Sequence, residues 1–236
     1  MVVVCGSRDR GVSSPFCSWC VSVQHAADRQ TALDTYVKAP DSHYRYRRVE
    51  KKRVPGCRDY LIRMISQQWR TPAQVDHSLW EHWVRIYVPD TVSANTGMLY
   101  IRGGSISDPR PEPNHDLESL AILTHTVASE VFDIPNEPLT FTGDPLGPRS
   151  EDQIIAYTWR KFLETDDSEW PLRLPMTKAA VRTMDTVTSF AASKQGGKHR
   201  VEHFVVTGAS KRGWTTWTTA AVVHVSSASL PWSLIF

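Results

Sequence analysis

The sequence predicts an α/β protein with a mostly parallel sheet and flanking helices. Strand-like runs come first along the chain, and helical and strand-like segments then alternate, which is the order of an α/β sheet with an antiparallel beginning. Near the end, an apolar strand runs into a glycine–serine turn that a helix follows. The composition, 41% hydrophobic and 22% charged with nine tryptophans in 236 residues, is that of a soluble globular protein with a sizeable core.

The first part of the chain is expected to consist of a disordered or atypical segment followed by strands. Residues 1–28 show neither periodicity nor a start signal for any element. Ordered patterning begins at 31–37, a short amphipathic turn. Four runs are then predicted as strands, at 44–54, 60–66, 83–88 and 98–101, and the last of them ends at Gly103 and Gly104.

Further along, the period of the apolar residues becomes helical. Positions 117–131 place apolar side chains on one face, so a helix is expected there with Asp116 as its N-cap. We found no internal repeat and no long linker, which favours a single domain, or part of one, over residues 31–221. The remaining expected elements are a short strand at 137–141, a helix opened by a capping box at 150–153, a helix from Pro175, a buried strand at 201–207 and a helix from about Arg212 to Ala221.

The segment 208–213, Gly-Ala-Ser-Lys-Arg-Gly, directly follows the apolar strand. A nucleophilic serine needs its Oγ held clear of the backbone, and the sharp G-x-S-x-G turn of α/β-hydrolases achieves this with glycines where side chains would collide. Gly208 lies two positions before Ser210, as that motif requires, but the second glycine, Gly213, comes one position late. Two interpretations follow: the nucleophile elbow of an α/β-hydrolase, or an ordinary turn with the serine as N-cap.

An oxyanion hole at this turn would need two backbone donors. The first would be the N–H of Lys211, directly after the serine, and the second would come from Gly103 and Gly104. Glycine pairs let backbone N–H groups approach a ligand, but they also form simple turns. Both roles stay open for this pair.

The catalytic partners of Ser210 are missing from the rest of the chain. In α/β-hydrolases the acid and the histidine follow the serine, whereas here no Asp or Glu follows Ser210 and His224 is the only later histidine. His199 and His203 lie too near the strand to reach Oγ. We therefore expect a hydrolase-like fold truncated after the elbow, and a chain without esterase activity, because losing a triad member leaves little catalysis.

Several separate segments together resemble one protein family, the PhoPQ-activated pathogenicity-related proteins, which include the autocrine proliferation repressors of amoebae. The elbow is also similar to that of the glucuronoyl esterases. The resemblance spans about 31–221, and the tail 222–236 diverges from it. The segments that carry the resemblance are 31–41, 66–70, 82–83, 151–159, 174–179, 184–185 and 208–217.

This resemblance implies an α/β-hydrolase fold in a protein that is normally secreted or periplasmic, although the usual secretory signal is missing and members are much longer. Three functions stay open. The chain derives from a serine hydrolase acting on an ester or amide of an unknown small molecule or polymer. Alternatively, it is a non-catalytic extracellular signal that a cell-surface receptor recognises, or a truncated product with neither activity.

Composition and spacing argue against other classes of function. A net charge of +2 and a pI near 8.4 are too mild to indicate nucleic-acid binding. The basic run 45–53 is interpreted as a solvated strand edge in preference to a phosphate-binding face. No apolar window is long enough for a membrane span. Cys17 and Cys20 have redox-motif spacing, but no βαβ pattern surrounds them.

No metal or cofactor is expected. The spacing of Asp76, His77, Glu81 and His82 differs from the helical pair of histidines that zinc enzymes use. An acidic, proline-rich loop, 108–118, follows the glycine pair. It is read as a solvated loop, with a substrate mouth as the alternative.

Overall fold

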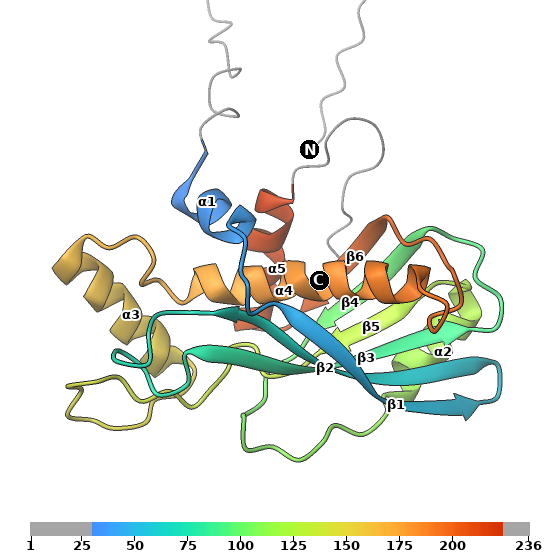
Figure 1. Cartoon of the computed structure of the whole chain (residues 1–236), viewed down its shortest axis with the longest axis horizontal. Coiled ribbons are helices and arrows are strands. Elements are labelled where there is room, and N and C mark those ends of the chain that lie inside the picture. The colour runs from blue at the N-terminus through green and yellow to red at the C-terminus, as the bar shows by residue number, and fades with distance from the viewer. Residues whose placement is uncertain (1–29, 224–236) are drawn as a thin grey trace, which may run out of the picture. The chain divides into compact units, whose positions relative to one another are not determined.

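A computed structural model describes residues 30–223, and the compact unit that begins at Thr31 is built on one six-stranded sheet (Figure 1). The expectations for residues 1–28, for Cys17 and Cys20 and for His224 lie outside the described residues. The strands are β1 (Arg45–Val54), β2 (Cys57–Gln68), β3 (Leu79–Pro89), β4 (Thr96–Ile101), β5 (Ala128–Val131) and β6 (His203–Gly208). The helices are α1 (Ala32–Lys38), α2 (His115–Thr124), α3 (Asp152–Thr165), α4 (Arg173–Ala192) and α5 (Lys211–Val222).

The strand order β1-β2-β3-β5-β4-β6 confirms the α/β class. The pairs β1–β2, β2–β3 and β3–β5 are antiparallel, and β5, β4 and β6 run parallel to one another. The described sheet is therefore mixed, and its parallel part is confined to three strands. A tight turn at Gly56, with φ +79°, joins β1 to β2 and so dictates their antiparallel pairing.

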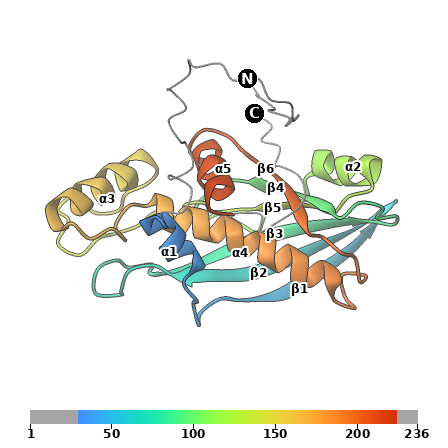
Figure 2. The ribbon, with the colours of Figure 1, turned by 90° about the horizontal axis from the view of Figure 1, so that it is seen from above.

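Helices cover both faces of the sheet (Figure 2). Neighbouring residues of a strand point to opposite faces. Ile86 and Leu99 accordingly join the core that includes the buried side of α4, whereas Tyr87 and Met98 pack in a second core with α2. On the first face the expected inward positions of α4 are confirmed as buried: Ala180, Met184, Val187 and Ala191.

One predicted helix is partly wrong. The helix expected over 117–131 ends at Thr124, with His125 in the left-handed conformation, and residues 128–131 form β5 between β3 and β4. All four residues of β5 are buried, because the strand is covered on both faces. The parallel part of the sheet therefore depends on a strand that the periodicity assigns to a helix.

Several predicted element ends also differ. Asn114, and not Asp116, caps α2, because its side chain accepts hydrogen bonds from the amides of Asp116 and Leu117. The capping box at 150–153 is absent, since α3 has Glu151 at its N-cap without a side-chain bond. The strand expected at 137–141 forms only isolated bridges, Val75–Phe141 and Leu139–Arg149.

Candidate active site

The turn between β6 and α5 places Ser210 on the surface. β6 lies parallel beside β4, with Gly208 opposite Ile101 at the end of the register. Ser210 is exposed and has φ 54° and ψ −122°, a conformation that costs a non-glycine residue about 1–3 kcal/mol. It occupies the N-cap position of α5, yet its side chain makes no capping hydrogen bond. Ser210 is thus the N-cap residue by position, as the second interpretation expects, but its side chain does not cap the helix.

At Gly208 a side chain does not fit, and at Gly213 a side chain would be crowded by backbone. A Cβ on Gly208 would lie 2.8 Å from the backbone of Arg212, and a Cβ on Gly213 would lie 3.0 Å from the carbonyl oxygen of Gly208. The first turn of α5 thus packs directly on the end of β6. In this fold the second glycine is needed at 213, and position 212 carries a side chain instead.

Arg212 brings the glycine pair and the serine turn together. Gly103 and Gly104 follow β4, and a Cβ on Gly103 would lie 3.0 Å from the guanidinium carbon of Arg212. Arg212 in turn donates to Glu151, with 2.7 Å between its Nη1 and Oε1. The guanidinium therefore lies against the Gly103 backbone and is held from its other side by a carboxylate.

Glu151 was not expected at the site. It pairs with Arg212 and also with Lys211, whose Nζ lies 2.9 Å from Oε2. Burial raises the pKa of Glu151, but hydrogen bonds from the two cations outweigh it and leave the pKa below its ordinary value. The carboxylate therefore stays ionised, and it ties the start of α3 to the start of α5. These contacts span some 60 positions of sequence, so no local pattern could have identified them.

Lys211 is the first residue of α5, where amide N–H groups have no acceptor within the helix and the helix dipole is positive. Its carbonyl oxygen accepts from Nη1 of Arg173 at 3.0 Å, and the same guanidinium lies 3.7 Å from the centre of the Trp214 ring. Arg173, the first residue of α4, therefore holds the start of α5 in place. A negative charge that develops beside Ser210 would face this end of the helix.

The acidic loop contributes to a cavity beside the glycine pair. A cavity of about 420 Å³ is lined by Gly103, Gly104, Asp108 and Glu112, and by Asp133 from the end of β5. His115 and Asp116 line a neighbouring, more open hollow. Part of the loop therefore borders a hollow next to the proposed oxyanion side.

The four ligand-type residues at 76–82 do not converge. Glu81 pairs with Arg63, and His82 is fully buried, with its Nε2 3.0 Å from Ser66 Oγ and its Nδ1 3.0 Å from the carbonyl oxygen of Phe132. Burial lowers the pKa of His82 to about 4, so the ring is neutral at physiological pH. His82 is a structural link between β2, β3 and the end of β5.

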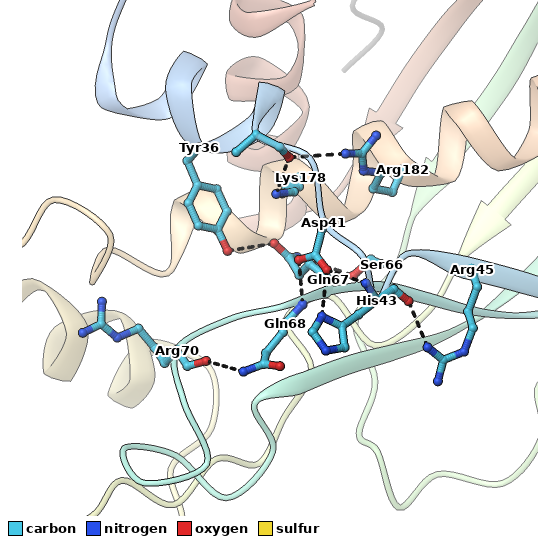
Figure 3. Close-up of polar contacts among 11 residues, drawn as sticks. Tyr36, Asp41, His43, Arg45, Ser66, Gln67, Gln68, Arg70, Lys178 and Arg182 are labelled. Atoms are coloured by element: carbon cyan, nitrogen blue, oxygen red, sulfur yellow. Dashed lines mark hydrogen bonds and ion pairs between the residues drawn. The ribbon is translucent and has the colours of Figure 1, made fainter.

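A second polar cluster lies where α1, β2 and α4 meet (Figure 3), and Ser66 connects it to His82. Tyr36 donates to Gln67, with 2.9 Å between the oxygens, and its ring lies 4.9 Å from the ammonium of Lys178. Lys178 donates to the carbonyl oxygen of Ala39, and Asp41 accepts from the amide of Gln68. The members satisfy one another, so this cluster anchors α1 to the sheet and to α4.

The topology and the site together define the class of protein. An antiparallel start, three parallel strands with β5 inserted between β3 and β4, and a glycine-flanked serine between strand and helix are the features of an α/β-hydrolase-like protein. The family model of the PhoPQ-activated pathogenicity-related proteins matches residues 33–233. The chain belongs to this family.

One curated relative is autocrine proliferation repressor protein A of Dictyostelium discoideum, which is 39% identical over 195 residues. The match covers 81% of this chain and 38% of the relative, so the chain spans well under half of that protein's length. A candidate acetyl xylan esterase of Bacteroides fragilis aligns over 81% of this chain and 48% of its own, with 13% identity and a TM-score of 0.48. Acetyl xylan esterase 1 of a Thermoanaerobacterium species aligns over 80% and 54%, with 13% identity and a TM-score of 0.45.

Within residues 30–223, no helix combines the length and the apolar character needed to cross a membrane. The same residues hold no group of three or more His, Cys, Asp and Glu side chains that could bind a metal ion.

Proposed function

We propose that this chain carries the nucleophile and the oxyanion-binding turn of a secreted serine hydrolase that cleaves esters. Ser210 is the nucleophile. The amide of Lys211 and those of Gly103 and Gly104 are the oxyanion donors. The observation that carries the proposal is the backbone of Ser210, which is strained at an exposed strand-to-helix turn.

Strain of this kind persists only where the surroundings enforce it, and it is concentrated at functional sites. Here Gly208 and Gly213 permit the close packing that enforces it, since a Cβ on Gly208 would collide with backbone and one on Gly213 would crowd it. An ordinary turn between a strand and a helix has no need of an exposed serine in this conformation. A nucleophile does need it, because the turn holds Oγ away from the backbone.

The surroundings also suit a developing oxyanion. Donors stabilise a transition state best when they are held in place before the reaction begins. Arg212 contacts Gly103 and is fixed by Glu151, while Arg173 fixes the carbonyl of Lys211. Both halves of the proposed oxyanion hole are therefore braced by ion-paired or hydrogen-bonded side chains.

The proposal assigns no general base among residues 30–223. His82 is buried with both ring nitrogens bonded, and His203 lies on β6 itself. Without a base, a serine hydroxyl reacts very slowly. We therefore expect the chain as given to show no steady turnover of short acyl esters.

A serine-directed fluorophosphonate probe tests the proposal. The probe should label the wild-type chain slowly, should fail to label the Ser210→Ala variant, and should label the Ser189→Ala variant as it does the wild type. Ser189 is a suitable control because it is also exposed and lies on α4, away from the turn. Equal labelling of wild type and Ser210→Ala would contradict the proposal.

The identity with the amoebal repressor favours a second candidate function, an extracellular signal that limits growth without catalysis. The two functions separate when secreted protein is added to growing cells. If the signal is non-catalytic, the Ser210→Ala variant should repress proliferation as strongly as the wild type. If hydrolysis is required, the variant should have no effect.

A further inference from the structure

Asp133 is a buried acid that opens into the cavity beside the glycine pair. Only 5% of the residue is exposed, and it lines the cavity of about 420 Å³. Among residues 30–223, no side chain or amide forms a hydrogen bond or ion pair with its carboxyl group, and neither carboxyl oxygen is sealed off from the cavity. Buried carboxyl groups are normally paired, because burial without a partner costs several kcal/mol. An unpaired one that lines a cavity is therefore a candidate ligand-binding group.

Backbone hydrogen bonds and two residues with positive φ hold Asp133 at the cavity. Its amide donates to the carbonyl oxygen of Gly103 at 3.2 Å, and the next amide, of Ile134, donates to Arg102 at 3.1 Å. Asp133 itself has φ 63°. Gly104, with φ +135°, leaves room for the carboxylate, since a Cβ there would lie 2.5 Å from Asp133 Oδ1. The cavity thus lies outside the carboxyl ends of β4 and β5, where α/β sheets bind their ligands.

The charges around Asp133 come from several elements. Burial raises its pKa to about 7, Arg63 on β2 opposes the rise, and Asp108 and Glu137 add to it. His82 on β3 lies next to this turn and is neutral. Near neutral pH a large share of Asp133 is therefore protonated, and the carboxyl group can both donate and accept a hydrogen bond.

The other walls of the cavity favour a ligand without net charge. Trp83 and Phe132 contribute aromatic surface, and two guanidinium groups, of Arg102 and Arg110, also line it. Arg102 is already paired with Glu130 and Arg110 with Glu50, so an anion would compete with existing partners. Asp108 and Glu112 line the cavity as well, so a cation would meet these two carboxylates together with both guanidinium groups, and the walls favour neither sign of charge.

The rim of the cavity is held in place. Arg85 donates from Nε and Nη2 to the carbonyl oxygen of Pro111, at 3.2 and 2.6 Å, and also pairs with the buried Asp59. The amide of Asn114 donates to Tyr87 at 2.8 Å. The proline-rich loop is therefore fastened to the sheet, and the cavity exists before any ligand arrives, which reduces the ordering cost of binding.

We propose that this cavity binds a neutral, hydroxyl-rich group such as a sugar ring, with Asp133 as the central hydrogen-bonding residue. Hydroxyl groups can satisfy a carboxyl that both donates and accepts, and the apolar face of a sugar ring suits the aromatic walls. The volume falls within the range of about 300–1,000 Å³ typical of small-molecule sites. This binding does not depend on Ser210, so it stands or falls separately from the proposed hydrolase function.

The test uses isothermal titration calorimetry with three ligands that share one ring. At about pH 6, where the charges are compared, D-glucose is neutral, D-glucosamine is a cation and D-glucuronate is an anion; D-xylose and D-galactose extend the neutral set. We expect a neutral sugar to bind most tightly at about pH 6 and to weaken severalfold by about pH 8, as Asp133 loses its proton. Binding of none of the neutral sugars, or tighter binding of a charged one, would overturn the proposal.

Variants of Asp133 test its role. The Asp133→Ala variant should bind the same sugar about tenfold more weakly, as expected for the loss of a buried hydrogen bond. The Asp133→Asn variant keeps a donor and an acceptor and should bind without the change between pH 6 and 8. Asp185→Asn removes an exposed carboxylate on α4 and should leave the wild-type pH dependence. If Asp133→Ala does not fold, the Asp133→Asn profile decides: a pH dependence equal to that of the wild type would refute the assignment.

Discussion

At Ser210 and Asp133 the fold holds a residue in a state that it would not adopt in the unfolded chain. Ser210 keeps a strained backbone on the surface, and Asp133 keeps a carboxyl group in a site where none of residues 30–223 pairs with it. Each state lowers the stability of the folded protein. Such costs are common where a protein's function depends on the strained or buried group.

The backbone strain at Ser210 can be measured as a difference in stability between two variants. Glycine tolerates the conformation at φ 54°, so the Ser210→Gly variant should be more stable than Ser210→Ala by about 1 kcal/mol. The same pair at Ser189, in the last turn of α4, should differ in the opposite direction by up to about 1 kcal/mol, because glycine weakens a helix. Urea unfolding of the four variants measures both differences. A Ser210→Ala variant as stable as Ser210→Gly, or more stable, would mean that Ser210 is not strained.

Asp133 should make the protein less stable as the pH rises. Its pKa is raised from 3.8 to about 7 on folding, so its favourable contribution is complete below pH 3.8 and is lost as the pH rises through about 7. The Asp133→Asn variant should therefore unfold like the wild type near about pH 4 and be more stable by on the order of 2–4 kcal/mol near about pH 8. Thermal or urea unfolding at the two pH values tests this. An equal effect at both pH values would contradict it.

At the scale of the elements, buried polar links hold the ends of the strands in register. His82 on β3 joins Ser66 of β2 to the carbonyl of Phe132, directly after β5. Phe132 precedes Asp133, so this link helps to fix the turn that borders the cavity. Trp80 and Trp69 pack beside it, edge to face.

Acid should break this link. The pKa of His82 is lowered on folding from 6.5 to about 4, so its neutral form contributes stability that is complete above pH 6.5 and is lost as the pH falls towards 4. The loss should be on the order of 3 kcal/mol over that interval. The His82→Gln variant can keep both hydrogen bonds but does not titrate, and its stability should fall less over the same range. Parallel stability–pH curves for the two proteins would exclude this role.

The elements that sequence reasoning found are those with strong local signals. The strands of the first half alternate or carry long apolar runs, and α5 and the turn before it are marked by glycines at fixed spacing. β5 was missed because it is only four residues long and buried on both faces, so Ala128 and Val131 continue the helical spacing of α2. The left-handed residue that ends α2 is His125. Because glycine is the usual residue at such a position, the sequence does not indicate that the helix ends there.

The candidate site likewise has a part that local sequence patterns could predict and a part that depends on contacts between distant segments. Ser210, Lys211 and the glycines at 208 and 213 are neighbours in sequence, so a local pattern could predict the turn between β6 and α5. The contacts of Arg212 with Gly103 and Glu151 join three separate segments, so they depend on the sheet order that β5 creates. Asp133 was missed for the same reason, because its position follows a strand that the sequence did not reveal.

At the scale of the whole molecule, the chain is one part of a larger family pattern. It belongs to the PhoPQ-activated pathogenicity-related proteins and covers 38% of the length of the amoebal repressor. Residues 30–223 hold the serine turn and the glycine pair at the carboxyl ends of parallel strands. We propose that these parts are already arranged for nucleophilic attack and need only a base.

Chemical rescue measures that claim most directly. The rate at which a fluorophosphonate probe modifies Ser210 is followed by mass spectrometry with and without added imidazole, which can take the proton that a catalytic histidine would accept. We predict that imidazole accelerates modification at Ser210, that the effect grows with the fraction of neutral imidazole as the pH rises, and that Ser189 shows no such acceleration. Modification of Ser210 that is no faster with imidazole, or no faster than at Ser189, would contradict the account.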